Sequence, residues 1–198
     1  MTLDLLYALV GFAFVTVITP GPNNLMLMAS GANFGFRRTV PHMFGIGLGM
    51  PLMVLLVGIG IMQVFDQWPA TYTVLKVLSV GYLLYLAWKI ANAAPPEKTE
   101  AKGEPLSFLQ AAAFQWVNPK AWTMALSAIT LYAASRDLPA VLWVAGTYVA
   151  VSLISTTSWT VLGQQMRRWL KSPARMRVFN WTMAGLLVAT LIPVLWPA

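Results

Sequence analysis

The sequence has no cysteine, one histidine and few charged residues. Charged residues make up 10% of the 198 residues, whereas soluble domains contain about 25%. The lack of cysteine excludes a disulfide framework, a thiolate metal site and a cysteine nucleophile. With one histidine and no acidic residue deep inside an apolar run, the chain lacks an acid–base pair for catalysis and enough axial ligands for a haem carrier. We therefore expect neither an enzyme nor a bound cofactor or metal.

Most of the sequence is apolar. Hydrophobic residues make up 58% of it and the mean hydropathy is +0.67, so most of the chain is expected to contact the lipid bilayer. The net charge of +7 raises the alternative of a nucleic-acid partner. The basic residues, however, lie in short gaps between apolar runs, as membrane topology requires. The start, "MTLDLLYALV", has no basic segment and carries Asp4, which predicts a first span and not a cleaved signal peptide. We expect no nucleic acid.

Six apolar runs are candidates for membrane spans, each of which needs about 20 residues. They cover residues 5–36, 43–62, 70–88, 108–134, 138–163 and 178–198. The alternative, core helices of a soluble bundle, would require polar faces, which the second, fifth and sixth runs almost lack. Between the third and fourth runs, "NAAPPEKTEAKGEPLS" is typical of a solvated loop. We predict an all-α membrane protein with six transmembrane helices.

The basic residues divide unevenly between the five loops that six spans leave. The second and fourth loops hold only Arg136. The odd-numbered loops hold ten, namely Arg37, Arg38, Lys89, Lys98, Lys102, Arg167, Arg168, Lys171, Arg175 and Arg177. Because loops rich in Lys and Arg stay in the cytoplasm, we expect the odd loops there and both termini in the periplasm.

The loop at residues 93–105 separates two halves of three spans each, residues 1–92 and 106–198. Three is odd, so the second half is expected to enter the membrane from the opposite side. The first span of each half contains a break, "TPGPNN" at residues 19–24 and "QWVNPKAW" at residues 115–122. Interruptions at matching positions of two halves indicate a transporter binding site. We predict one membrane domain built as a 3+3 inverted repeat with broken helices 1 and 4.

Proline explains what such a break does. Pro20, Pro22 and Pro119 should each free the carbonyl four residues earlier, which lipid does not tolerate unless protein, water or ligand binds it. Each break also starts a new half-helix, and Asn118 is a preferred cap for the second. A helix N-terminus attracts an anion and freed carbonyls attract a cation. We therefore predict a site for a small zwitterion.

Polar side chains near the breaks have two readings each. The amides of Asn23 and Asn24 either bind the solute or hold the half-helix to its neighbours. Lys120 either attracts a carboxylate or satisfies the carbonyls freed in the other break. Lys76 lies near a span end, where snorkelling is a sufficient explanation. His42 is interpreted as an interfacial residue more readily than as a proton relay.

Two other segments stand out within the runs. "GIGLG" at residues 45–49 is a GxxxG pattern, which permits close helix packing. The adjacent hydroxyls at residues 155–158 either face a cavity or bond their own helix backbone.

The segment "ITPGPNNLMLMASGANFGFRRT", a glycine-rich second span and "FQWVNPKAW" together resemble the LysE/RhtB superfamily of amino-acid exporters. The resemblance covers the whole chain. It implies a bacterial inner-membrane protein that exports amino acids or close derivatives, driven by the proton gradient. The motifs are similar to those of members that move neutral solutes such as threonine, homoserine, cysteine or O-acetylserine. The expected substrate-binding residues are Thr19, Pro20, Gly21, Pro22, Asn23, Asn24, Gln115, Asn118, Pro119 and Lys120.

Alternating access of the two halves around a central site is the expected mechanism. Two alternatives stay open: a channel or facilitator for small polar solutes, since broken helices also line filters, and a structural membrane partner. A homodimer is a further open alternative, because six spans make a small bundle. The sequence leaves the particular amino acid, the coupling ion and the stoichiometry open.

Overall fold

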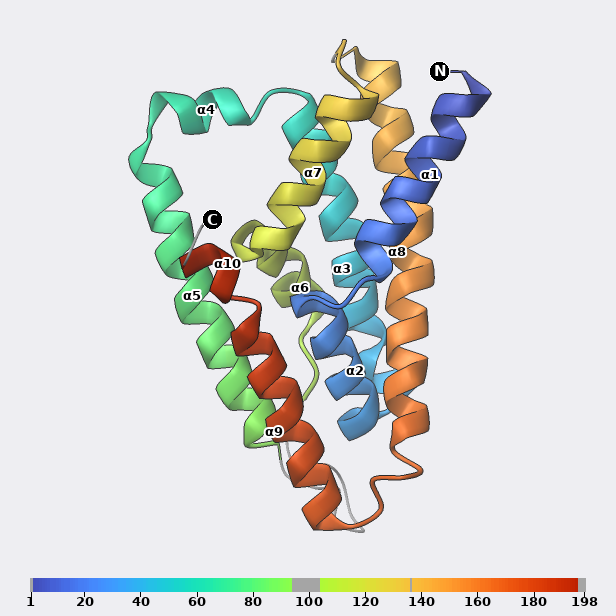
Figure 1. The fold of residues 1–198 in the computed structure, drawn as a ribbon, viewed down its shortest axis with the longest axis vertical. Coiled ribbons are helices and arrows are strands. Elements are labelled where there is room, and N and C mark those ends of the chain that lie inside the picture. Colours follow the sequence, from blue (N-terminus) through green and yellow to red (C-terminus); the bar gives the residue numbers. More distant parts are fainter. Residues whose placement is uncertain (1, 94–103, 136, 196–198) are drawn as a thin grey trace.

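The computed structural model describes residues 2–93, 104–135 and 137–195, and in this part of the chain every regular element is a helix (Figure 1). The all-α prediction is therefore confirmed. The predicted loop at residues 93–105 lies almost wholly outside the described residues. The elements are α1 (Leu3–Ile18), α2 (Pro22–Phe34), α3 (Phe36–Gly58), α4 (Met62–Gln67), α5 (Ala70–Ala91), α6 (Phe108–Phe114), a 3-10 turn (Gln115–Val117), α7 (Pro119–Tyr132), α8 (Leu138–Met166), α9 (Pro173–Ala189) and α10 (Ile192–Leu195).

Four segments of the described chain are long and apolar enough to cross a membrane, or five if the bent pair α1–α2 counts as one span. The four are α3, α5, α8 and the segment Pro173–Leu195. The six predicted spans are therefore not all found. The one not found as a continuous span is residues 108–134, which the 3-10 turn and Pro119 divide, within the predicted break at residues 115–122, into α6 with 7 residues and α7 with 14. Neither piece can span a bilayer alone.

The first run is broken where the sequence predicts it. α1 ends at Ile18, and the chain runs through extended Gly21 before Pro22 begins α2. The two helices meet at a bend of 56°. Proline suits the first position of a helix, where its missing N–H costs nothing, so this cluster both stops one helix and starts the next.

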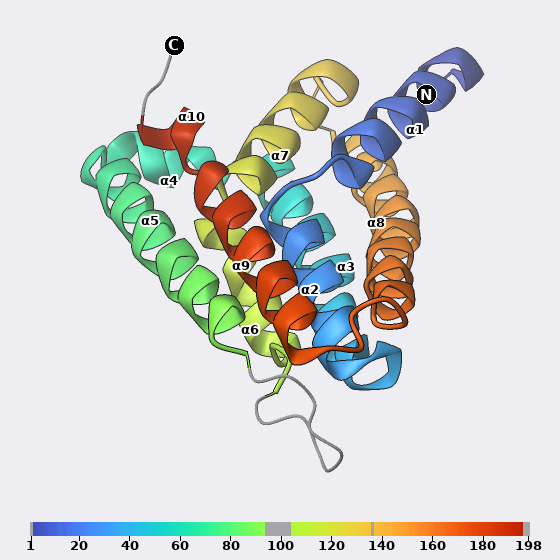
Figure 2. The same ribbon diagram turned by 60° about the horizontal axis from the view of Figure 1, so that its bottom comes forward.

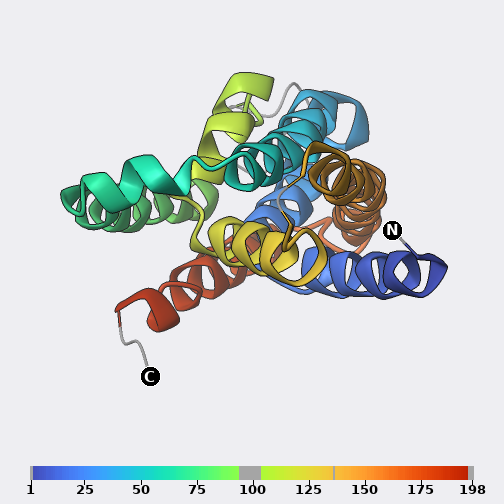
Figure 3. The same ribbon diagram turned by 90° about the horizontal axis from the view of Figure 1, so that it is seen from above.

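The helices pack in two groups (Figures 1 and 3). α3 and α8 form the central pair, with α1 and α2 against α8 and with α6 and α7 against α3. α5 and α9 pair with each other to one side. A Cβ added at Gly49 would lie 2.8 Å from Ala112 Cα, so the glycines of "GIGLG" bring α3 close to α6 as predicted. Large apolar side chains such as Tyr7, Val77 and Trp181 are exposed on the outer faces, which suits contact with lipid.

Candidate functional site

The two breaks lie side by side, although 92 residues separate their bonded side chains. Asn23 Nδ2 donates to Gln115 Oε1 at 2.9 Å, and Gln115 Nε2 donates back to Asn23 Oδ1 at 3.2 Å. Gln115 Nε2 also donates to the Ala111 carbonyl at 2.9 Å. Gln115 is fully buried. This reciprocal amide pair therefore joins the start of α2 to the end of α6.

The carbonyls that proline frees are all bound within the protein. The carbonyl of Thr16 accepts a hydrogen bond from the Thr19 hydroxyl at 3.1 Å, and the carbonyl of Ile18 accepts one from Trp159 Nε1 at 3.0 Å. The carbonyl of Gln115 accepts one from the backbone N–H of Asn118 at 3.2 Å. The prediction that these groups become free is thus correct, but the protein already satisfies them. The expectation that they await the solute's ammonium is not met in this conformation.

Asn24 stabilises the first break by binding carbonyls at the end of α1. Its Nδ2 donates to the carbonyls of Val17 and Thr19, at 2.7 and 2.9 Å. The Ser155 hydroxyl of α8 donates to the same Val17 carbonyl at 3.1 Å. Asn24 is 4% exposed. Of its two predicted roles, the structure shows the structural one, because the amide ties the start of α2 back to the end of α1.

Lys120 reaches from α7 across to the first break. Its Nζ donates to the Thr19 carbonyl at 2.8 Å, to Thr19 Oγ1 at 2.9 Å and, more weakly, to the Pro20 carbonyl at 3.4 Å. The ammonium therefore occupies the place where the carbonyl dipoles favour a cation. It brings a positive charge to the N-terminus of α2, which has no side-chain cap. Charge and helix end together favour an anion.

Gly21 makes room for this lysine. A Cβ at Gly21 would lie 2.7 Å from Lys120 Cδ and 3.1 Å from its Nζ. The backbone at Gly21 is extended and would accept any residue, so the glycine is required for space. Any larger side chain would push the ammonium away from the Thr19 carbonyl.

A small cavity, here called the central cavity, lies where the breaks meet. Five of the ten predicted residues line it, together with hydroxyls from α8 and apolar side chains from α3. The five are Gly21, Asn23, Asn24, Asn118 and Lys120. The others do not line the cavity but form the breaks around it, and these are Thr19, Pro20, Pro22, Gln115 and Pro119.

Ser152 is a cavity-lining hydroxyl that the sequence analysis did not single out. It lines the central cavity and is 1% exposed, yet its Oγ has no hydrogen-bond partner among the described residues. Of the four adjacent hydroxyls at residues 155–158, Thr156 lines the cavity. A helix places residues four apart on one face, so the spacing from Thr156 would have indicated Ser152.

The predicted location is wrong for His42 and agrees with the structure for Lys76. His42 is 2% exposed, so it is buried and does not lie at the interface as expected. Neither of its ring nitrogens has a hydrogen-bond partner among the described residues. Lys76 is exposed on α5 and does not line the central cavity. This position agrees with snorkelling.

The Asn23–Gln115 pair yields a direct test of the contact between the breaks. Replacing either residue with leucine should lower stability by about 1–3 kcal/mol, because the partner's amide stays buried without its bond. The double variant should lose about 0.5–3 kcal/mol less than the two singles combined. Thermal unfolding in detergent of the four proteins measures this difference. Strict additivity would show that the two side chains do not interact.

The fold and the site together define a class: a multi-pass membrane protein whose interrupted spans meet at an internal cavity lined by polar residues, as in secondary transporters. The chain belongs to the family of LysE type translocators, whose model matches residues 14–192. It is therefore a transporter and not an enzyme, as the sequence predicts. The resemblance stated from the motifs is confirmed.

Relatives cover almost the whole chain. The cysteine/O-acetylserine efflux proteins of Escherichia coli (strain K12) and Shigella sonnei (strain Ss046) are each 32% identical to it over 194 residues. The alignment spans 95% of this chain and 96% of each relative. No solved structure matches the chain.

Proposed function

We propose that this protein exports small neutral amino acids, or derivatives such as O-acetylserine, from the cytoplasm across the bacterial inner membrane. Family membership supports amino-acid efflux, and the relatives' names supply the solute class. The observation that carries the proposal is the central cavity, where Asn23 pairs with Gln115 and Lys120 crosses from one break to the other.

The chemistry of the cavity favours a neutral zwitterion. The Lys120 ammonium and the uncapped start of α2 attract the carboxylate. The Ser152 hydroxyl, which has no partner among the described residues, and the amide oxygen of Asn118, which already accepts from the Lys120 backbone N–H at 3.1 Å, offer lone pairs for the ammonium. No acidic side chain is among the described residues that line the cavity. A second positive charge on the solute would therefore meet Lys120 without compensation.

The packing supports the proposed 3+3 inverted repeat of residues 1–92 and 106–198. α2 lies on α8 as α7 lies on α3, and α1 lies on α8 as α6 lies on α3. Two further pairs, α3 with α8 and α5 with α9, each join corresponding helices of the two halves, and α2 packs on α3 as α7 packs on α8. Exchanging the halves preserves these pairs, whereas the contacts of α1 with α7 and of α2 with α9 have no equally extensive counterpart. In alternating access the halves would move around the central cavity, and the bonds from Lys120 to Thr19 would open and close.

The proposed orientation has both termini in the periplasm and the loop at residues 93–105 in the cytoplasm. The natural absence of cysteine allows a simple test, because any introduced thiol is unique. Gln67 and Ala174 are exposed and lie in an even-numbered and an odd-numbered loop region. An impermeant maleimide should label Gln67→Cys in intact spheroplasts but Ala174→Cys only after lysis. The reverse pattern would contradict the orientation.

Counterflow in proteoliposomes tests the function. Preloaded unlabelled O-acetylserine should accelerate uptake of labelled O-acetylserine if the protein is a carrier, and an imposed proton gradient should drive accumulation. A channel would show flux without acceleration. A structural membrane partner would show no flux beyond that of empty vesicles, and either of these outcomes would contradict the proposal.

A further inference from the structure

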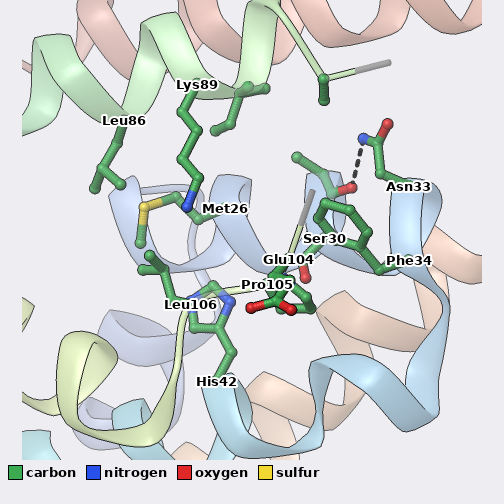
Figure 4. A pocket seen from close by; sticks show the side chains of 13 residues that line it. Met26, Ser30, Asn33, Phe34, His42, Leu86, Lys89, Glu104, Pro105 and Leu106 are labelled. Atoms are coloured by element: carbon green, nitrogen blue, oxygen red, sulfur yellow. Dashed lines mark hydrogen bonds between the residues drawn. The ribbon is translucent and has the colours of Figure 1, made fainter. Parts of the chain in front are cut away.

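A second cavity, whose lining shares no residue with that of the central cavity, lies between α2, α3, α5 and residues 104–106. Figure 2 shows how these three helices are arranged, and Figure 4 shows the cavity from close by. We call it the lower cavity. Its walls are mainly apolar, with Met26, Leu86 and Leu106 among the lining residues. Three ionisable side chains that the central cavity does not use also line it: His42, Lys89 and Glu104. Figure 4 shows these three side chains around one space.

His42 supplies the strongest indication of a ligand. It lines the lower cavity, is 2% exposed, and has neither ring nitrogen hydrogen-bonded within the described chain. A neutral imidazole carries one donor and one acceptor, and buried polar groups are nearly always paired. A small molecule in the cavity would provide the bonds that the described residues do not.

Lys89 and Glu104 bring opposite charges to the same space. In Figure 4 the Lys89 ammonium points into the cavity from α5, and the Glu104 side chain reaches the same cavity from the chain segment before α6. The other polar groups of the wall are already engaged: Ser30 bonds Thr39 at 2.9 Å, and Asn33 bonds Asn180 at 2.8 Å. One cation, one anion and one unpaired imidazole therefore remain to recognise a ligand.

We propose that the lower cavity is a second binding site for a zwitterionic amino acid with a hydrogen-bonding side chain. Lys89 binds the carboxylate, Glu104 the ammonium and His42 the polar group of the side chain. The inference rests on the proposed function, since it requires the same class of solute. Asn23 of the central cavity and Ser30 of the lower cavity are both on α2, and seven residues of helix span about 10 Å. The lower cavity is thus a staging site on the cytoplasmic approach.

Protection of a single introduced cysteine tests this site. Ala93→Cys places a thiol in the wall of the lower cavity. In purified protein, saturating O-acetylserine should slow its reaction with a maleimide at least about threefold. The same protection should persist when Lys120→Met disables the central cavity. His42→Leu should weaken the apparent affinity for protection about tenfold, the effect of one lost hydrogen bond. His42→Gln, which keeps a donor and an acceptor, should retain the apparent affinity of the unmodified residue.

The controls separate this site from the central one. Ala174→Cys, exposed and outside both cavities, should react at the same rate with and without solute. If Lys120→Met abolishes protection of Cys at position 93 and His42→Leu does not, the solute acts through the central cavity and the proposal is wrong. Protection by phosphatidylethanolamine alone would also overturn it. Lys89→Met serves as a second variant should His42→Leu fail to fold. Counterflow by the unmodified protein separately decides the proposed function.

Discussion

Replacing Lys120 with methionine should lower export on the order of 100-fold, equivalent to about 2.8 kcal/mol, while the protein still inserts in the membrane. The substitution removes the charge that faces the central cavity and the bonds from Nζ to Thr19 and Pro20. Hydrogen bonds of charged groups contribute about 1.5–3 kcal/mol each. Asn24 still binds the Thr19 carbonyl at 2.9 Å, so the first break keeps part of its support.

Lys76→Met is the matched control for this variant. It removes the same charge from an exposed position on α5 that lines none of the cavities described. Labelled O-acetylserine efflux from proteoliposomes, with size-exclusion profiles to verify folding, measures both variants. Normal export by Lys120→Met would show that the solute does not depend on the charge in the central cavity, and would contradict the proposed binding site. Equal loss in both variants would indicate an effect of net charge alone.

The second large effect is expected from Gly163→Ala, which should lower the midpoint of thermal unfolding by about 2–12 °C. A Cβ added at Gly163 would collide with the Met28 carbonyl on α2. A Cβ added at Gly31 would likewise collide with the Thr160 carbonyl on α8. Overpacking of this kind costs about 1–3 kcal/mol, and each kcal/mol shifts the midpoint about 2–4 °C in a chain of this size. Export should fall as well, because α8 holds the first break through Ser155 and Trp159.

Gly146 offers the control on the same helix. A Cβ there has nothing within 4 Å, so Gly146→Ala should leave the midpoint unchanged or raise it slightly, since alanine favours a helix over glycine. Thermal unfolding in detergent distinguishes the two variants. Equal midpoints would show that α2 and α8 do not approach each other as closely as described.

The breaks could be predicted because their causes are local. Proline and glycine act on the backbone of their own few residues, so "TPGPNN" located the break between α1, which ends at Ile18, and α2, which begins at Pro22. The glycines of "GIGLG" likewise indicated close packing without naming the partners, which are α6 at Gly45 and Gly49 and Leu153 of α8 at Gly47. The matching positions of the breaks indicated one shared site, but the sequence did not indicate the pairing of Asn23 with Gln115.

The partners of the freed carbonyls could not be predicted, because they come from distant parts of the chain. Trp159 and Ser155 lie on α8, more than 130 residues beyond the carbonyls that they bind. Burial of His42 is likewise a tertiary property, since it depends on α2 and α5 covering one face of α3. The sequence also predicted the break at residues 115–122, but hydropathy alone did not show that it divides residues 108–134 into two short helices, α6 and α7.

The thiol reactivity of Ser152→Cys tests the central claim, that the two breaks enclose the solute, most directly. The substitution places one thiol, nearly the size of the natural hydroxyl, in the wall of the central cavity of a chain without cysteine. A small methanethiosulfonate reagent should modify it, and saturating O-acetylserine should slow the reaction at least tenfold. Equal rates with and without the solute, in protein that still catalyses counterflow, would place the solute elsewhere and contradict the account.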